Sequence, residues 1–221
     1  MTTRQFPLFI SFEGTEGSGK STQMRLLVER LRAQGFAVTT NQEPGGTSIG
    51  LQIRRVLLDP VNHEMAGITE LLLMFASRAQ AAAEIIIPAL QRGEIVISDR
   101  FTDSTLAYQG YARGLGFETV QQAQRLAVGS LIPDLTLFIA VDLETGLARA
   151  HRRNAEAVNG VSEARLDAQS LEFHRRVEEG YRKIAEAEPQ RFRVIDGNGR
   201  PDEVAARVWA EVGAALAARS R

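Results

Sequence analysis

The fold is decided by residues 8–31, LFISFEGTEGSGKSTQMRLLVERL. Residues 8–12 form a short apolar run of the kind that becomes a buried strand. Residues 14–21 match the pattern G-x-x-x-x-G-K-[ST], and apolar residues then recur at helical spacing between residues 24 and 31. A strand, a glycine loop and a helix in this order predict a site that binds phosphate groups.

The glycine loop, residues 14–21, has the composition needed to hold a nucleoside triphosphate. Its glycines let the backbone wrap around phosphate oxygens, so that amide N–H groups and the start of the helix point at the anion. Lys20 is expected to reach the β- and γ-phosphates, and the Ser21 hydroxyl to bind Mg²⁺. Among the 26 basic residues only Lys20 and Lys183 are lysine. The candidate residues for the ATP phosphates are Gly14, Thr15, Glu16, Gly17, Ser18, Gly19, Lys20, Ser21 and Thr22.

Four more strand-like runs follow along the chain, at residues 37–40, 94–98, 135–141 and 192–195. Segments with helical periodicity lie between them, and this alternation predicts a parallel sheet. Nearly continuous apolar strands suit a sheet that is covered on both faces. We therefore expect an α/β fold of the P-loop NTPase type: a doubly wound, five-stranded parallel sheet flanked by helices, in a single domain that spans residues 1–221.

The composition is that of an ordinary globular protein, with 44% hydrophobic and 24% charged residues. Cysteine is absent, which excludes disulfides and thiolate metal sites, and the three histidines lack metal-ligand spacing. The net charge of −1 argues against general nucleic-acid binding. We find neither an apolar run of membrane-spanning length nor a secretory signal, and so expect a cytoplasmic protein without membrane or nucleic-acid partners.

Three further groups of residues are candidates for the site around the phosphates. Asp99 and Arg100 end the third strand, at the edge of a parallel sheet where ligands bind. Residues 43–47, EPGGT, form a turn after the second strand. Phe75 and Arg78 lie on one face of a long predicted helix, where an aromatic ring and a bidentate donor suit a nucleobase. Each group also has a purely structural interpretation: a local ion pair, an ordinary turn, or a core aromatic beside a surface charge.

A basic segment between residues 151 and 165 interrupts the regular pattern. It lacks a sustained apolar stripe and contains Arg152, Arg153 and Arg165. We expect a mobile excursion between two helices, which forms a small lid over about residues 150–166.

Six short motifs occur along the chain in a fixed order. They are F-E-G at residues 12–14, E-P-G-G-T at 43–47, L-L-M-F at 72–75 before Arg78, D-R-F at 99–101, A-Y-Q-G at 107–110 and P-D-L-T at 133–136. Each motif alone is weak, but six in register are specific. Together they resemble the thymidylate kinase family over nearly the whole chain.

The resemblance implies phosphorylation of dTMP by ATP, with Mg²⁺ as the metal and Ser21 and Asp99 as candidate ligands. Arg100 would clamp the dTMP phosphate, Arg78 would hydrogen-bond the thymine, and Phe75 would stack on the base. The family also implies a homodimer. The dTMP-binding candidates are Glu43, Pro44, Phe75, Arg78, Asp99, Arg100, Ser104, Thr105, Tyr108 and Gln109.

A phosphate acceptor calls for neutralisation of charge and not for a general base, because a phosphate monoester with a second pKa of about 6 is largely dianionic near pH 7. The resemblance places Glu16 near the reacting phosphates. The glycine loop contains no arginine, which resembles the bacterial type that supplies the transition-state cation from a lid. The expected catalytic residues are Lys20, Glu16, Arg100, Arg153 and Arg165, with Arg149 and Arg152 as further lid candidates.

Two positions depart from the family pattern. The residue before the E-P-G-G turn is usually arginine in the family, and here it is Gln42. The stacking phenylalanine usually lies four residues before the base-reading arginine. That position is Met74 here, with Phe75 one residue later. We expect Phe75 to take the stacking role.

Two other functions are compatible with a glycine loop of this type. A deoxynucleoside kinase that phosphorylates thymidine would share the loop and the Asp99-Arg100 pair, and would need a carboxylate base such as Glu43. An ATP-driven partition or switch protein would need a water-positioning element, often D-x-x-G after a strand. The third strand here ends instead in Asp99-Arg100-Phe101.

Overall fold

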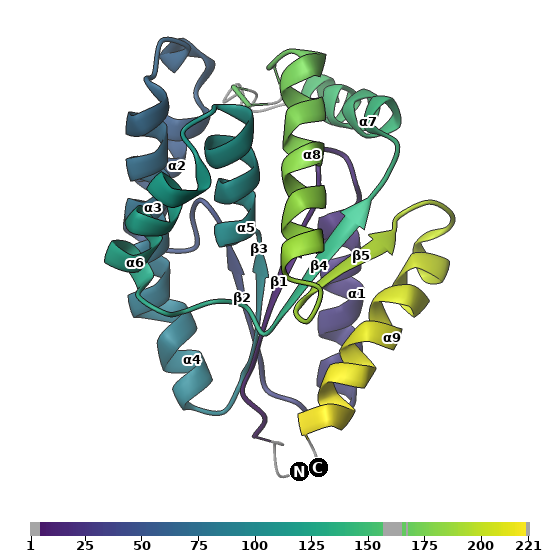
Figure 1. Cartoon of the computed structure of the whole chain (residues 1–221). Coiled ribbons are helices and arrows are strands. Elements are labelled where there is room, and N and C mark those ends of the chain that lie inside the picture. Colours follow the sequence, from purple (N-terminus) through teal and green to yellow (C-terminus); the bar gives the residue numbers. More distant parts are fainter. Residues whose placement is uncertain (1–4, 157–164, 167, 220–221) are drawn as a thin grey trace.

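The computed structural model describes residues 5–156, 165–166 and 168–219, apart from the side chains of residues 151 and 153–156. Its centre is a five-stranded parallel sheet in the order β2-β3-β1-β4-β5 (Figure 1). The strands are β1 (Leu8–Glu13), β2 (Val38–Gln42), β3 (Ile95–Asp99), β4 (Leu135–Ala140) and β5 (Phe192–Asp196). The five expected strands and the doubly wound arrangement are confirmed.

Helices cover both faces of the sheet, with α1 and α9 packed together on one side (Figure 1). The helices are α1 (Lys20–Ala33), α2 (Ser48–Leu58), α3 (Gly67–Ala81), α4 (Ile87–Gln91), α5 (Thr102–Thr105), α6 (Phe117–Val128), α7 (Leu143–Glu156), α8 (Leu171–Ala187) and α9 (Pro201–Arg219). A 3₁₀ turn (Pro60–Asn62) and two π-helical turns (Ala82–Ile86 and Leu106–Ala112) complete the elements.

β1 is buried along its whole length because it lies between two layers of helices. Leu8, Ile10 and Phe12 pack in a core cluster with apolar residues of α1 and α9. Phe9 belongs to a second cluster, which contains Phe101. Successive side chains of a strand point to opposite faces of the sheet, so a covered strand requires apolar residues on both.

α3 continues through a π-helical turn into α4, so that one helix runs from Gly67 to Gln91. This confirms the long helix that precedes the third strand. Its length and mean hydropathy of 1.4 would suit a membrane span, but 44% of the apolar window is buried inside the protein. Glu70 and Arg78 lie on its buried side, where both pair with charged groups of the protein. These features are those of a core helix.

α7 extends further than the sequence pattern indicated. It ends at Glu156, so residues 151–156 of the expected excursion are helical. Alanine, arginine, leucine and glutamate are favourable helix formers, and they sustain this helix where an apolar stripe is lacking. Residues 157–164 of the expected lid lie outside the described part of the chain. Arg165 and Leu166, at its end, are buried.

An ion pair ties α5 to the sheet beneath it. Asp103 is fully buried and accepts hydrogen bonds from both terminal nitrogens of Arg191, each at 2.7 Å. Thr136 of β4 donates to the same carboxylate at 2.8 Å. α5 directly follows the third strand, so this pair also holds the segment that begins at Arg100.

Candidate active site

A cleft of 680 Å³ opens at the carboxyl ends of β1, β2 and β3. Phe12 of β1 and Gln42 of β2 both lie opposite Asp99 of β3, so the segments that follow the three strands leave the sheet together. The predicted residues that line the cleft are Glu16, Gly17, Ser18, Gly19, Lys20, Ser21, Thr22, Glu43, Pro44, Arg78, Asp99, Arg100, Ser104, Thr105, Tyr108 and Gln109. Arg54, Leu58 and Leu166 also line it, and no motif indicated them.

Lys20 lies folded within the glycine loop. Its Nζ donates to the carbonyl oxygens of Gly14 and Thr15 at 3.0 and 3.2 Å. Burial and the positive charge of Arg100 lower the pKa of Lys20. Ser21 is exposed at the start of α1, where the helix dipole favours an anion. One wall of the cleft therefore presents donors and positive charge.

The glycine loop packs directly against α7. A Cβ atom on Gly17 would lie 2.0 Å from the carbonyl oxygen of Gly146, and a Cβ atom on Gly146 would lie 2.6 Å from the carbonyl oxygen of Glu16. Gly17 also has a φ of 68°, in the left-handed region that favours glycine. Neither position accepts a side chain without a shift of backbone, so these two glycines set the spacing between the loop and α7.

Arg100 joins the segment after β3 to the glycine loop. It has a φ of 70°, and no other non-glycine residue that the structure describes has a positive φ. Nη2 donates to Glu16 Oε2 at 2.7 Å, and Nη1 donates to Ser104 Oγ at 3.0 Å. The guanidinium carbon lies 5.1 Å from the centre of the Tyr108 ring. Left-handed backbone at a non-glycine residue persists only where the surroundings hold it, which is typical of ligand sites.

The charges at the centre of the cleft support one another. Burial alone would raise the pKa of Glu16, but the charges of Arg100 and Lys20 outweigh it and lower that pKa. Burial also acts against the charge of Arg100, yet Glu16 holds the pKa of Arg100 well above its usual value. The Tyr108 hydroxyl donates to Glu16 Oε1 at 2.8 Å, and burial raises the pKa of Tyr108, which keeps the hydroxyl a donor.

Arg78 is buried, and each of its three nitrogens has a partner. Nε pairs with Glu43, Nη1 donates to Thr105 Oγ1 at 2.9 Å, and Nη2 donates to the Phe101 carbonyl at 3.0 Å. Burial raises the pKa of Glu43, and the charge of Arg78 opposes that rise. The guanidinium is thereby fixed in one orientation at the wall of the cleft, as recognition of a planar group requires.

Ser21 and Asp99 line the same cleft and are the candidate metal ligands. Over the described residues, no three histidine, cysteine, aspartate or glutamate side chains gather into a metal cluster. Mg²⁺ usually keeps several waters and takes one or two protein oxygens beside substrate phosphates. One hydroxyl and one carboxylate therefore fit a Mg²⁺ ion that is shared with a nucleotide.

The family model described as thymidylate kinase matches residues 12–208. The chain belongs to the thymidylate kinase family. The thymidylate kinase of Pelobacter propionicus is 50% identical over 204 residues, which are 92% of this chain and 93% of that protein. The thymidylate kinase of Syntrophotalea carbinolica is 50% identical over 208 residues, 94% of this chain and 96% of that protein.

The same family is found among solved structures. The crystal structure of the thymidylate kinase from Ehrlichia chaffeensis matches with a TM-score of 0.75 and 32% identity, over 94% of this chain and 99% of that chain. The protein is therefore an ATP-dependent phosphotransferase of the thymidylate kinase family.

In this member of the family, the aromatic residue of α3 does not lie where the sequence predicted. Phe75 is buried in a core cluster with Leu71 and Tyr108 and does not line the cleft, whereas Met74 does. Met74 lies four residues before Arg78 and shares its face, while Phe75 is turned about 100° further around the helix. The Phe75 ring instead packs 4.9 Å from the Arg78 guanidinium. Met74, and not Phe75, is therefore the α3 side chain that faces the cleft at this level.

The expected lid arginines lie in different environments. Arg149 lines the cleft, and Arg152 is exposed. The side chain of Arg153 falls outside the described part of the chain. Arg165 is buried, with Nη2 2.7 Å from Glu70 Oε2, and it does not line the cleft. Arg165 thus anchors the chain to α3 in this structure, and Arg149 has the access to the cleft that was predicted for Arg165.

Glu70 supports the cleft-lining residue Gln109 from behind, and none of the motifs indicated it. It is fully buried on α3, where it accepts hydrogen bonds from Gln109 Nε2 at 2.7 Å and Arg113 Nη2 at 3.2 Å. Burial alone would raise its pKa, but the Gln109 hydrogen bond and the Arg113 charge lower it. Its spacing could have revealed it, because Glu70, Met74 and Arg78 recur every four residues on one helix face.

Replacement of Gly146 by alanine should lower the catalytic efficiency of the enzyme with ATP. The added Cβ would meet a carbonyl oxygen of the glycine loop at 2.6 Å, so the loop and α7 would have to separate. A misplacement of about 1 Å near reacting groups can lower a rate about 100-fold. We expect kcat/KM for ATP to fall on the order of 10-fold or more, measured by steady-state kinetics with the acceptor saturating.

Gly213→Ala in α9 is the matched control for this variant. A Cβ atom there would lie 3.7 Å from the Trp209 ring, at ordinary contact distance. Its kinetics should equal those of the unaltered protein. An unchanged kcat/KM for ATP in the Gly146→Ala variant would contradict the tight contact between the loop and α7.

Proposed function

We propose that this chain is a cytoplasmic enzyme that transfers the γ-phosphoryl group of ATP to dTMP and forms dTDP, with Mg²⁺ bound beside the phosphates. The observation that carries the proposal is the 2.7 Å ion pair between Arg100 and Glu16. It connects the proposed acceptor clamp to the loop that would bind the donor, within one cleft. A phosphate on Arg100 would then lie beside a phosphate on the glycine loop.

The chemistry of this reaction fits the charges in the cleft. The phosphate of dTMP is largely dianionic near pH 7, since its second pKa is about 6, and it needs no base to remove a proton. Lys20 and Arg100 would neutralise the charge of donor and acceptor and hold them in line. Mg²⁺ supplies further neutralisation of charge at the phosphates, and Ser21 and Asp99 are the residues proposed to hold it.

The base would be read by the fixed side chains on the opposite wall. Arg78 is held by Glu43 and Thr105 and can present its guanidinium edge to a thymine carbonyl. Gln109 is held by Glu70, and Met74 offers an apolar surface for one face of the ring. Groups whose rotamers are locked by buried partners recognise a planar ligand with little loss of entropy.

The deoxynucleoside kinase alternative has less support in this geometry. It requires Glu43 as a base for a sugar hydroxyl, and Glu43 is buried in an ion pair with Arg78. A carboxylate that is engaged in this way is a poor acceptor for a substrate proton. Membership of the thymidylate kinase family also disfavours an ATP-driven partition or switch protein.

The purified protein with Mg-ATP should convert dTMP to dTDP and leave thymidine unphosphorylated. A site built to hydrogen-bond a substrate group rejects an analogue that lacks the group by about 10⁴-fold, because its polar side chains are left unpaired. Anion-exchange chromatography of the products measures both reactions. Phosphorylation of thymidine with dTMP untouched would establish the nucleoside kinase instead. ATP hydrolysis that is indifferent to dTMP would favour the switch protein.

We further propose that α7 supplies the cation for the transition state, as part of a lid over residues 150–166. Arg149 lines the cleft, and position 153 lies one helical turn later along α7. The close contact of Gly146 with the glycine loop puts the start of this helix beside the proposed donor site. Arg149, which lines the cleft, and Arg153, one turn later, are therefore the two candidates.

Arg153→Ala should lower kcat by about 10³-fold, because a transition-state cation in related phosphoryl transfers contributes on that scale. KM for ATP and dTMP should change little, since the charge it stabilises develops only in the transition state. Arg149→Ala is measured in parallel to rank the two positions. Arg152→Ala, at an exposed position, is the control. If kcat of all three variants equalled that of the unaltered protein, the assignment of the cation to α7 would be overturned.

Arg165→Ala should affect stability more than chemistry. It would remove a cation from the fully buried Glu70, a loss on the order of 3 kcal/mol in the free energy of unfolding.

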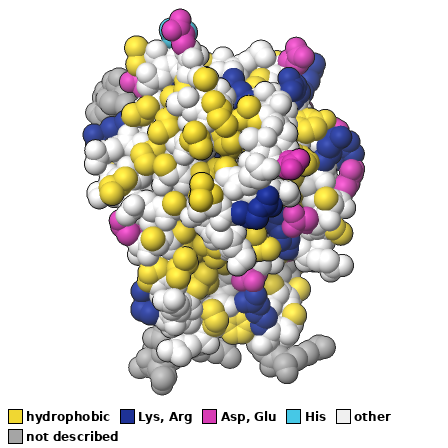
Figure 2. All heavy atoms as spheres, turned by 60° about the vertical axis from the view of Figure 1, so that its left-hand side comes forward, with side chains coloured by type: hydrophobic (Ala, Val, Ile, Leu, Met, Phe, Trp, Pro, Cys, Tyr) yellow, Lys and Arg dark blue, Asp and Glu magenta, His cyan; other side chains and the backbone are white. Residues whose placement is uncertain are grey.

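We propose that two copies form a homodimer through the face made by α2, α3 and α6. Figure 2 shows apolar side chains gathered over this side of the molecule. Exposed apolar faces of this kind commonly mark protein interfaces. The exposed apolar residues of the three helices are Ile49, Leu51, Val56, Ile68, Leu72, Phe117 and Leu126.

Leu72→Glu should convert the dimer to a monomer, because a charge would be buried at the centre of an apolar interface. Light scattering coupled to size-exclusion chromatography measures the mass. Val194→Glu is the matched control, since Val194 on β5 is 58% exposed and Leu72 is 56% exposed. A monomeric unaltered protein, or a Leu72→Glu variant that stays dimeric, would contradict this interface.

A further inference from the structure

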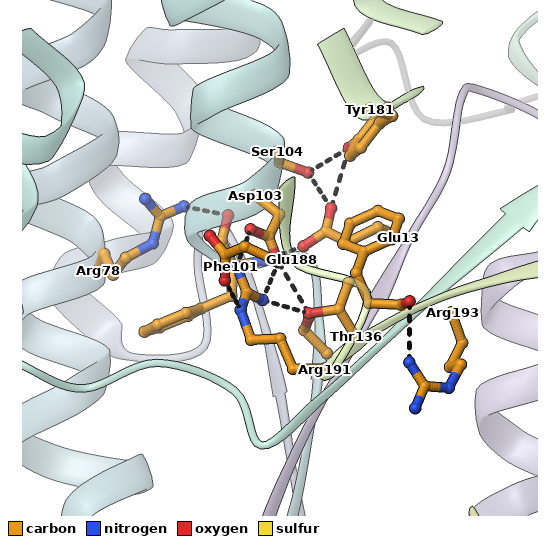
Figure 3. Close-up of polar contacts among 12 residues, drawn as sticks. Glu13, Arg78, Phe101, Asp103, Ser104, Thr136, Tyr181, Glu188, Arg191 and Arg193 are labelled. Carbon is orange, nitrogen blue, oxygen red and sulfur yellow. Dashed lines mark hydrogen bonds and ion pairs between the residues drawn. The ribbon is translucent and has the colours of Figure 1, made fainter. Parts of the chain in front are cut away.

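Glu13, the last residue of β1, is fully buried and does not line the cleft. Its Oε1 accepts the backbone N–H of Phe101 at 2.8 Å. Its Oε2 accepts the hydroxyls of Ser104 at 2.5 Å and Tyr181 at 2.9 Å. Figure 3 shows both hydroxyls pointing to the same carboxylate. The carboxylate is thus surrounded by hydrogen-bond donors.

The same two hydroxyls also contact Arg100. Its Nη1 donates to Ser104 Oγ at 3.0 Å and to the Tyr181 hydroxyl at 3.3 Å. A hydroxyl has one proton to give and lone pairs to accept with. Both hydroxyls can therefore accept from Arg100 while their protons point to other oxygens. Glu13 Oε2 is within reach of both, and the two hydroxyls also lie 2.9 Å from each other.

We propose that Glu13 is a positioning residue for the reaction, whose carboxylate turns the Ser104 and Tyr181 hydroxyls so that they hold Arg100 in place to clamp the acceptor phosphate. The proposal rests on the proposed function, in which Arg100 binds that phosphate. Glu13 acts through the two hydroxyls and touches no substrate. Glu16 holds Nη2 from the cleft side, so the guanidinium is fixed from both sides.

Protonation of Glu13 would disturb this arrangement. A proton on Oε1 would face the N–H of Phe101, and a proton on Oε2 would face oxygen atoms that already accept from Arg100. One hydroxyl would then turn its proton to the other, which lies 2.9 Å away. Arg100 would lose the attraction of the Glu13 charge, which acts on it across the two hydroxyls.

Burial raises the pKa of Glu13 to about 7, and the negative charge of Asp103 adds to the rise. The positive charge of Arg100 and the Ser104 and Phe101 hydrogen bonds oppose it. Lys20 and Tyr181 are the other titratable groups coupled to Glu13, and burial lowers the pKa of Lys20 and raises that of Tyr181. The carboxylate form thus predominates only above about pH 7.

The raised pKa also sets the effect of Glu13 on stability. A folded protein that holds an acid at a raised pKa binds more protons than the unfolded chain between about pH 4.5 and about pH 7. Stability is therefore lost as pH rises through this window. The form of Glu13 that supports Arg100 is therefore the form that contributes less to stability.

The test uses Glu13→Gln in the full-length enzyme, with Glu94→Gln as the matched control. Glu94 directly precedes β3, so it lies at the opposite end of that strand from Asp99. In Glu13→Gln we expect KM for dTMP to rise about 10-fold at pH 8, because about that much affinity is lost with one hydrogen bond to a charged group. KM for ATP should change less than about twofold. Glu94→Gln should match the unaltered enzyme.

The pH dependence gives a second readout. In the unaltered enzyme, protonation of Glu13 should raise KM for dTMP as the pH falls through about 7. The phosphate of dTMP, with a second pKa of about 6, adds a separate change at lower pH. Glu13→Gln should keep only the change due to dTMP. The unaltered enzyme should lose stability as the pH is raised from about 4.5 to about 7, and Glu13→Gln should not. The melting temperature of Glu13→Gln minus that of the unaltered enzyme should therefore increase over this range.

Tyr181→Phe keeps the test decisive if Glu13→Gln fails to fold. It removes one of the two hydroxyls and should raise KM for dTMP without a comparable change in KM for ATP. If KM for dTMP depended on pH in both variants as it does in the unaltered enzyme, the role of Glu13 would be overturned. An equal rise of both KM values would do the same, since it indicates a general disturbance. An unaltered enzyme that ignores dTMP would overturn the proposed function, and this proposal with it.

Discussion

The ion pair between Arg100 and Glu16 is the contact on which the rest of the cleft depends. It spans from the segment after β3 to the glycine loop after β1, with Nη2 and Oε2 2.7 Å apart. The pair can form because the two strands are parallel and in register, so that their carboxyl ends meet at one edge of the sheet. Each side chain is largely shielded from water, with 17% of Arg100 and 12% of Glu16 exposed, so each charge needs the other. The two loops are therefore held together by their own electrostatics, and the proposed donor and acceptor sites become one site.

The residues around this pair divide into those that stabilise the fold and those that do not. Asp103 is bonded by Arg191 and Thr136 outside the cleft, and its charge is fully matched. By contrast, burial raises the pKa of Glu13 and Glu43, and Arg100 has left-handed backbone. Buried charges that are only partly compensated add little to stability, and strained backbone reduces it. These states are maintained by the surrounding packing, and they cluster where the proposed chemistry takes place.

Much of the fold follows from short-range patterns, and the site follows only in part. The strand, loop and helix of residues 8–31 predict the phosphate loop, because its glycines and Lys20 are consecutive in sequence. The ion pair of Arg165 with Glu70 joins positions that no local pattern relates, so a lid role was the natural expectation for Arg165. Met74 faces the cleft and Phe75 does not, because neighbouring residues of a helix point about 100° apart. Composition and motif order do not resolve a difference of that size.

The packing of α7 on the glycine loop links the two parts of the proposed reaction. Gly17 and Gly146 approach so closely that neither accepts a Cβ atom without a shift of the backbone. Arg149 projects from the same helix into the cleft, one turn of chain after this contact. A donor that orders the loop would therefore also fix the helix that carries the proposed cation. The transition-state charge would then be met only when ATP is bound, and an arginine within the loop itself is not needed.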